Sequence, residues 1–322
     1  MLRCAIYLFL LVLLSMTGCH KFKGDQEVPA YIQIDSIIVS QASASAFGLT
    51  PTSKIVDAWI TVDGRSLGCY QLPIKSIPVL AEGEHKVLIQ AGILANNLSL
   101  RRGIYPFYSG VELTVNFVED SIINVTRKED GTMRTAVAIR EYNRYPLGNE
   151  DFERGKHGFD TVSSYKSVPL QMKSCNTVSE KFPKSSTPQR FYEDNVGYIH
   201  LTKSDSCCCI MTKEACTKGT ETALPYSQPI FIELDYLTNN IFEVGIVSTI
   251  SNKPYIHPVV VVGNQKNPQW SKIYVDISSA VGTQYFDADN FKILIRAYLE
   301  ESNEEAYIYL DNIRIVYSSQ TI

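Results

Sequence analysis

The stretch of sequence that decides the fold is Trp270-Ser-Lys-Ile-Tyr-Val-Asp-Ile277, in which apolar and polar side chains alternate. In an extended strand the side chains at odd positions, from Ile273 to Ile277, share one face. Those at even positions, from Lys272 to Asp276, share the other face. A period of two with one apolar face predicts a β-strand in a half-buried antiparallel sheet.

Several further runs rich in β-branched and aromatic residues surround this strand. The segments between them have the Asn, Gly, Pro and Ser composition of turns, and almost no amphipathic helical pattern interrupts them. Many strands at short spacing predict an antiparallel β-sandwich. The predicted strands are Gly197–Leu201, Ile230–Tyr236, Phe242–Ile246, Val259–Val262 and Phe291–Tyr298.

The first part of the chain shows the same period of two in a separate set of strands. Ala58–Val62 leads into Asp63-Gly64, a dipeptide typical of tight hairpin turns. Val111–Val118 alternates cleanly and forms a predicted hairpin with Ile122–Val125, and the charged, turn-rich stretch Arg127–Thr132 follows. We therefore expect a first β-domain over residues 30–126 and a linker over residues 127–149.

Short phrases in the first domain resemble a known kind of module. The hairpin at Asp63-Gly64 continues into Leu67-Gly68, and Glu82–Val87 precedes the next strand. These phrases resemble the PEGA-like and immunoglobulin-like modules of envelope proteins. The resemblance implies an immunoglobulin-like β-sandwich at the N-terminal end.

The two ends of the second domain resemble a different module. Phe152-Glu153-Arg-Gly155 and the closing run Ile308–Ile315 are similar to the first and last strands of jelly rolls of the carbohydrate-binding-module type. The segment Phe231–Tyr317 is also similar to uncharacterised Bacteroidetes envelope lipoproteins. The resemblance implies an all-β protein with a C-terminal jelly-roll β-sandwich over residues 150–322.

The N-terminus has the pattern of an export signal. One charged residue, Arg3, precedes an apolar-to-neutral run from Ala5 to Met16, which is too short to span a membrane. The small residues before Cys19 resemble the lipobox of bacterial lipoproteins. We therefore expect a signal peptide over residues 1–18, lipidation of Cys19, a tether over residues 19–29, and anchoring to the cell envelope at the outer membrane.

The charge balance argues against nucleic acid as a partner. The chain has 30 Lys and Arg against 34 Asp and Glu, and loss of residues 1–18 removes only Arg3, leaving 29 against 34 and a net charge of -5. The expected partners are the membrane, through the N-terminal lipid, and a polysaccharide or another envelope protein.

Glycan binding needs aromatic faces that stack on sugar rings beside polar groups that bind the hydroxyls. The candidates are Tyr236, Tyr255, Trp270 and Tyr274. The jelly-roll resemblance also implies a structural calcium, for which Glu153 and Asp311 stand at the matching positions. No other cofactor is expected.

The mature chain has six cysteines besides Cys19, and an exported protein can form disulfides. Three of them are consecutive, from Cys207 to Cys209, and Cys216 follows. A bridge from Cys207 or Cys209 to Cys216 is the favoured pairing, with buried free thiols as the alternative. The remaining pairings, which involve Cys69, Cys175 and Cys208, stay open.

Catalytic motifs are scarce. Gly64–Gly68 matches the letters of G-x-S-x-G, but the surrounding pattern predicts a hairpin around Ser66 and not the strand-to-helix turn that a nucleophile needs. The leading hypothesis is therefore a non-catalytic envelope protein that binds glycans. The alternatives are a glycan hydrolase, with carboxylates paired in space or through Ser66, and a structural lipoprotein that binds another envelope protein.

Overall fold

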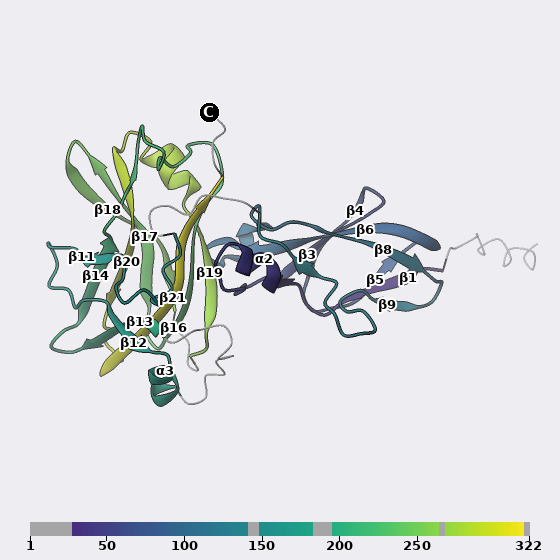
Figure 1. Cartoon of the computed structure of the whole chain (residues 1–322), viewed down its shortest axis with the longest axis horizontal. Helices are drawn as coiled ribbons and strands as arrows, with labels where there is room; N and C mark the ends of the chain where they lie inside the picture. Colours follow the sequence, from purple (N-terminus) through teal and green to yellow (C-terminus); the bar gives the residue numbers. More distant parts are fainter. Residues whose placement is uncertain (1–27, 141–147, 183–194, 264–267, 319–322) are drawn as a thin grey trace, which may run out of the picture.

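The computed structural model describes residues 28–140, 148–182, 195–263 and 268–318 as two β-domains packed end to side (Figure 1). Strands dominate both domains, and the second domain is built from two large sheets. The predicted all-β architecture of two successive sandwiches is confirmed. Within these ranges no helix has both the length and the apolar character needed to cross a membrane.

The first domain contains a three-stranded sheet in the order β5-β1-β9 and a larger sheet in the order β4-β3-β6-β7, with β8 also paired to β6. Figure 1 shows the two sheets running the length of the domain. Short helical segments, α2 (Gln41–Ala46), η1 (Ala95–Asn97) and η2 (Ser99–Arg101), connect the strands. The strands are β1 (Ala30–Ile34), β2 (Ile38–Val39), β3 (Asp57–Val62), β4 (Arg65–Gln71), β5 (Ile74–Val79), β6 (Gly83–Leu94), β7 (Arg102–Ile104), β8 (Val111–Phe117) and β9 (Ile122–Asn124).

The hairpin predicted at Asp63-Gly64 joins β3 to β4. Both turn residues adopt positive φ angles, 46° and 78°, which a glycine tolerates and which aspartate visits more readily than most side chains do. Ser66 lies within β4, opposite Thr61 of β3, and no helix follows it. The structure therefore contradicts the hydrolase alternative that used Ser66, because the sharp strand-to-helix turn is missing there.

The first domain extends further than the sequence predicted. β10 (Ala136–Val137) pairs in parallel with β2, and Val137 and Ile139 are buried in the core of the first domain. The predicted linker at residues 127–149 is therefore wrong over its first half, because the apolar side chains of residues 135–139 complete the first core instead of crossing solvent. Residues 141–147 lie outside the described ranges.

The second domain is a sandwich of two sheets. One sheet has the order β12-β13-β21-β16-β19, and the other has the order β11-β14-β20-β17-β18, with β15 also paired to β20. One α-helical turn, α3 (Asn176–Lys181), and a short π-helical segment, η3 (Ala280–Gln284), lie outside the sheets. The strands are β11 (Phe159–Thr161), β12 (Gln171–Ser174), β13 (Asn195–Thr202), β14 (Cys207–Thr212), β15 (Cys216–Thr217), β16 (Ile230–Thr238), β17 (Phe242–Ile250), β18 (Lys253–Val262), β19 (Ser271–Asp276), β20 (Asn290–Tyr298) and β21 (Glu305–Tyr317).

The two sheets of the second domain enclose one large apolar core. Phe152, just before β11, is fully buried, and its ring lies against Gly197 of β13. A Cβ atom at Gly197 would lie 2.5 Å from Cζ of Phe152, so the close approach of ring and strand requires glycine. β13 and β16 flank β21, whose residues from Ala306 to Tyr317 are buried.

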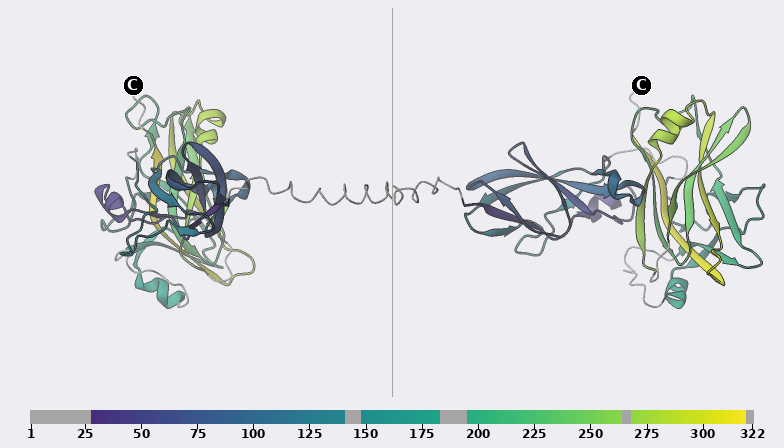
Figure 2. Two further views of the ribbon diagram at one scale, coloured as in Figure 1. Left: turned by 90° about the vertical axis from the view of Figure 1, so that its right-hand side faces the viewer. Right: turned by 180° about the vertical axis from the view of Figure 1, so that it is seen from behind.

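The outer faces of the two sheets have different neighbours. The first domain packs against the face that includes β16 and β19, where Phe231, Tyr274 and Val316 join the core of the first domain. The helix α3 packs over another part of the same sheet through Val178. The outer face of the β14, β20 and β17 sheet lies away from the first domain in the views of Figures 1 and 2.

Four charged side chains are buried where the two domains meet. Nζ of Lys272 lies 3.0 Å from Oε2 of Glu233 and 3.5 Å from Oδ1 of Asp235. Nη2 of Arg314 lies 2.6 Å from the same Oε2 atom of Glu233. Each of the four residues is at most 3% exposed. Two positive and two negative charges balance one another, as burial requires.

The first domain contributes directly to this cluster. Tyr105 donates its hydroxyl hydrogen to Oε1 of Glu233, and the ring of Tyr105 lies 5.2 Å from the ring of Phe231. The hydroxyls of Tyr108 and Tyr274 are 3.1 Å apart. Burial alone would raise the pKa of Glu233, but the nearby cations and the Tyr105 hydroxyl outweigh it and lower that pKa to about 2. Glu233 is therefore ionised at neutral pH and joins the two domains.

Removing the charge of Glu233 should destabilise the folded protein strongly. Glu233→Gln leaves Lys272 and Arg314 buried with one anion fewer, which typically costs about 3–5 kcal/mol. Urea unfolding at neutral pH measures the change. Glu304→Gln is the matched control, because Glu304 pairs with Lys203 on the exposed surface at 2.5 Å and should leave the midpoint nearly unchanged. Equal midpoints for the two variants would contradict the role given to Glu233.

The stability of the folded protein should also fall in acid, because the same carboxylate becomes protonated. The pKa of Glu233 in the folded protein is about 2, below its ordinary value of 4.5, so its contribution is complete above 4.5 and disappears as the pH falls towards 2. The stability gap between the natural protein and Glu233→Gln should therefore shrink between about pH 5 and about pH 2.5, as urea unfolding would measure. A gap that stays constant over this range would rule out the assignment.

Candidate functional site

The structure separates the four aromatic residues predicted to bind glycans. Tyr236 is 3% exposed and packs in the core, with its ring 5.6 Å from the ring of Phe242. Tyr274 is 1% exposed, because its face of β19 lies against the first domain. Neither ring can stack on a sugar while it is buried, so the structure contradicts both assignments.

The other two predicted aromatics have different surroundings. Trp270 is partly buried and packs against a small apolar cluster that includes Tyr309. Tyr255 is 45% exposed on β18, near the turn that joins β17 to β18. Of the four candidates, Tyr255 is the one whose exposure suits a stacking platform.

The outer face of the second sheet carries an aromatic and charged array that the sequence analysis missed. Tyr298 of β20 is 48% exposed, and the guanidinium carbon of Arg296 lies 5.6 Å from the centre of its ring. Nε of Arg296 lies 2.5 Å from Oε2 of Glu243, and Nη1 donates to the hydroxyl of Tyr165 at 3.3 Å. We call Tyr165, Glu243, Arg296 and Tyr298 the open-face array.

Apolar side chains continue this face beside the array. Cys209, Val247 and Leu294 form a small cluster separate from the main core. Burial raises the pKa of Tyr298, so its hydroxyl stays neutral and can donate or accept a hydrogen bond. Two tyrosine rings, a fixed guanidinium and a carboxylate beside an apolar floor suit a ligand with both C–H and hydroxyl groups.

A sequence signal for this array existed in part. Phe291–Tyr298 was predicted as a strand, and its even positions carry Arg296 and Tyr298 while the odd positions are apolar. That alternation places both side chains on the face away from the core. Tyr165 follows β11 in a segment without regular secondary structure, so no periodic pattern indicated its position.

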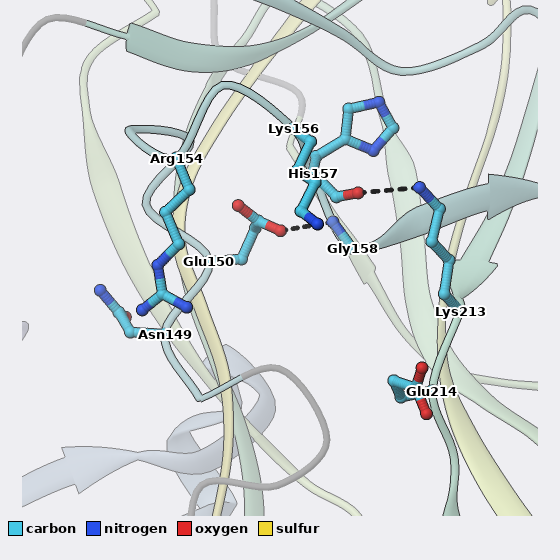
Figure 3. Close-up of a pocket in the computed structure, with 8 residues that line it drawn as sticks. All are labelled: Asn149, Glu150, Arg154, Lys156, His157, Gly158, Lys213 and Glu214. Atoms are coloured by element: carbon cyan, nitrogen blue, oxygen red, sulfur yellow. Dashed lines mark hydrogen bonds between the residues drawn. The ribbon is translucent and has the colours of Figure 1, made fainter.

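Apart from the open-face array, a pocket lies beside the segment before β11, at the end of β14 (Figure 3). It has a volume of about 280 Å³, and Arg154, Lys156 and Lys213 bring three cationic side chains to its edge. Nζ of Lys213 donates to the carbonyl oxygen of His157 at 3.0 Å. Glu150 lies in the middle of the hollow in Figure 3.

Glu150 and Glu214 are the carboxylates of this pocket, which is where paired acids of a hydrolase could meet. Burial raises the pKa of Glu150. Its two oxygens, however, accept hydrogen bonds from the backbone N–H groups of Phe152 at 3.2 Å and Gly158 at 2.6 Å. These bonds shape the loop before β11, and they account for the burial of Glu150 without a catalytic role.

Another hollow, which we call the interdomain groove, lies where the first domain meets the second and has a volume of about 590 Å³. Ile104 and Pro106 of the first domain form one wall. The rest of its lining comes from the second domain and consists of residues 226–229, Phe231, Asp276, Ser278, Ser279 and Thr283.

The two residues expected to hold calcium, Glu153 and Asp311, lie near each other, but Glu153 already accepts hydrogen bonds within the protein. The oxygens of Glu153 accept hydrogen bonds from the backbone N–H and the side-chain amide of Asn195, at 2.7 and 3.1 Å. Asp311 is 3% exposed, and burial, with Asp235 and Glu153 nearby, raises its pKa well above the ordinary range. Across the described ranges, no group of three or more His, Cys, Asp or Glu side chains is arranged to hold a metal. Calcium binding therefore stays a prediction.

The predicted disulfide is wrong. Cys207 and Cys209 point to the outer face of their sheet, where Cys209 joins the small apolar cluster, whereas Cys216 belongs to the main core between the sheets. On β20, Cys209 lies opposite Arg296 and Cys216 lies opposite Phe291, five residues away. That separation is roughly 17 Å along a strand, far beyond the reach of a disulfide. Cys207, Cys208 and Cys209 are free thiols.

Cys19, the expected site of lipidation, lies outside the described residues, as do the signal peptide and most of the tether. Its modification stays a prediction.

Comparisons with known proteins give low structural similarity and no sequence match. No protein-family model and no curated protein matches the chain. Among solved structures, carbohydrate-binding modules of the β-sandwich superfamily match with 11% identity and a TM-score of 0.36, over 91% of this chain and 99% of that one. A CBM22-1 xylan-binding domain from Paenibacillus barcinonensis matches with 12% identity and a TM-score of 0.35, over 57% of this chain and 100% of that one. A family 11 module of a Clostridium thermocellum cellulase matches with 15% identity and a TM-score of 0.32, over 55% and 95%.

The cysteine arrangement predicts a selective pattern of alkylation. Burial raises the pKa of Cys208 to about 12 and that of Cys209 to about 11, so both should resist iodoacetamide in the folded protein near about pH 8. Of the three consecutive cysteines, Cys207 is the partly exposed one and should react before Cys208 and Cys209. Peptide mass mapping before and after denaturation measures this order. A peptide that links Cys216 to Cys207 or Cys209 under non-reducing conditions would contradict the structure.

Proposed function

We propose that the protein is a non-catalytic glycan-binding protein of the bacterial cell envelope, and that its second domain binds the glycan on the open-face array. The observation that carries the proposal is the arrangement of Arg296 between two tyrosines. Its guanidinium lies over the ring of Tyr298, bonds the hydroxyl of Tyr165 and pairs with Glu243. A positioned ring beside fixed donors and acceptors is the chemistry that sugar recognition uses.

The array is organised before any ligand arrives. The pair between Arg296 and Glu243 fixes the guanidinium, and the apolar cluster around Leu294 supports the strands beneath. A ligand that binds such a face loses little affinity to ordering of the protein. A sugar ring could lay its C–H face on Tyr298, while its hydroxyls bond to Arg296 and Glu243.

The place of the protein in the cell belongs to the same proposal. The export signal and the small residues before Cys19 support lipid anchoring at the outer membrane. The protein would then bind the glycan at the membrane surface to which it is anchored. An envelope protein as partner is the competing possibility, and the experiment below distinguishes it.

The first experiment is thermal unfolding of the two-domain protein, residues 20–322, with soluble polysaccharides. A ligand that binds only the folded state raises the midpoint of unfolding. We expect a rise with at least one of β-glucan, xylan, galactan or mannan. No shift with any glycan, together with saturable binding to a purified envelope protein, would replace this proposal with the protein-partner hypothesis.

The open-face array predicts a specific loss of affinity on substitution. Tyr298→Ala removes the exposed ring and should weaken binding of the responsive glycan about tenfold. Tyr298→Phe retains the ring and should stay close to the natural protein. Isothermal titration calorimetry measures both, with Lys156→Gln at the pocket of Figure 3 as a control away from the array. Equal affinities for Tyr298→Ala and the natural protein would refute the assignment of the array.

A further inference from the structure

The interdomain groove has walls that are fixed relative to each other. Ile104 and Pro106 flank Tyr105, whose hydroxyl bonds to Glu233 and whose ring packs 5.2 Å from the ring of Phe231. On the second domain, the backbone N–H of Asp276 donates to Oδ1 of Asn96 in the first domain at 2.8 Å. Contacts from both domains therefore hold the groove in one shape, and the groove exists only because the domains are docked.

Apolar surfaces are exposed on both walls. Ile104 of the first domain is 40% exposed, and Tyr226 of the second domain is 39% exposed. Pro106 and Pro229 add rigid apolar surface to the lining. Nζ of Lys218 lies 5.7 Å from the ring centre of Tyr226, and this ring is still partly exposed to solvent. A ligand with flat C–H faces would cover these surfaces.

Polar groups line the same groove. Oδ1 of Asp276 accepts hydrogen bonds from the backbone N–H and the hydroxyl of Ser278, at 2.9 and 2.6 Å. Its Oδ2 lies 3.9 Å from Nη1 of Arg101, and the carboxylate side chain is 30% exposed. Gln228 and Thr283 add an amide and a hydroxyl to the lining. The groove therefore offers a carboxylate that accepts hydrogen bonds, together with amide and hydroxyl groups that can donate or accept them.

The charges of the lining indicate which ligands suit it. Among the described residues that line the groove, Asp276 is the one carboxylate and none is Lys or Arg. Arg101 offsets the charge of Asp276 and Lys218 stands singly at the ring of Tyr226, so the described lining has no array of cations that would select a strongly anionic chain. Hydroxyls can donate to the carboxylate and accept from amide and hydroxyl groups. A neutral, hydroxyl-rich ligand with C–H faces suits the groove on both counts.

We infer that the interdomain groove is a second contact site for a neutral oligosaccharide, with Tyr226 as the stacking ring and Asp276 as the hydroxyl acceptor. The inference rests on the proposed glycan-binding function and adds a site remote from the open-face array. It gives the first domain a part in recognition, because Ile104 and Pro106 line the same groove as Tyr226. A glycan bound there contacts both domains at once.

The test is isothermal titration calorimetry of the two-domain protein with six-residue oligosaccharides of β-glucan, xylan, galactan and mannan. Tyr226→Ala should weaken binding of the responsive oligosaccharide about tenfold, because the exposed ring is lost. Tyr226→Phe is the matched control and should bind within about twofold of the natural protein, since the ring remains. Ile104→Ser tests the contribution of the first domain and should also weaken binding.

Hydrogen exchange of the same complexes locates the ligand. Binding in the groove should slow exchange at residues 226–231 and 278–283, whereas binding on the array alone should slow it near residues 165, 243 and 296–298 and leave the groove segments unchanged. If Tyr226→Ala does not fold, Ile104→Ser and the exchange pattern decide the question, because Ile104 is already partly exposed.

The outcomes separate this inference from the proposed function. Loss of affinity in Tyr298→Ala, with none in Tyr226→Ala or Ile104→Ser, would overturn the groove and leave the open-face array in place. Loss in the groove variants alone would support the groove and overturn the array. No binding of any of the four oligosaccharides would overturn both, and binding of an unstructured peptide at residues 226–231 instead would assign the groove to a protein partner.

Discussion

The buried contact between Glu233, Lys272 and Arg314 is the constraint on which the two-domain arrangement depends. Separating the domains would expose these ions to water but would also remove the Tyr105 hydroxyl and the ring contacts that cover them. Charges taken out of water are tolerated only when their partners stay in place. The first domain is therefore a fixed part of the second domain's surface and differs from the loose spacer that a linker at residues 127–149 implied.

This arrangement gives the two sheets of the second domain different roles. The sheet that contains β16 and β19 loses part of its outer face to the first domain and another part to α3. The sheet that contains β14, β17 and β20 presents the array of Arg296 and Tyr298 on its outer face. The groove at the edge of the covered sheet arises from the same docking, since Ile104 and Phe231 meet there.

Particular residues show how far sequence patterns reach. The alternation of residues 270–277 correctly separated Ile273 from Tyr274, but Tyr274 was assigned to solvent when its face meets the first domain. Cys208 lies in the main core and Cys209 on the outer face, as the alternation of side chains along a strand requires. The predicted bridge between Cys209 and Cys216 is wrong because β14 and β15 pair with different parts of β20. The register between strands far apart in the sequence depends on the whole sheet.

The sequence by itself determined that the chain is all-β, that two sandwiches follow one another, where most strands lie and which side chains share a face, because these depend on local alternation and turn residues. Only the tertiary structure decided which faces are covered. Burial of Tyr274 beside Tyr105, exposure of Tyr298 and the groove beside Tyr226 all depend on contacts between residues far apart in the chain. A period of two marks two faces of a strand, and it carries no information about what packs on either of them.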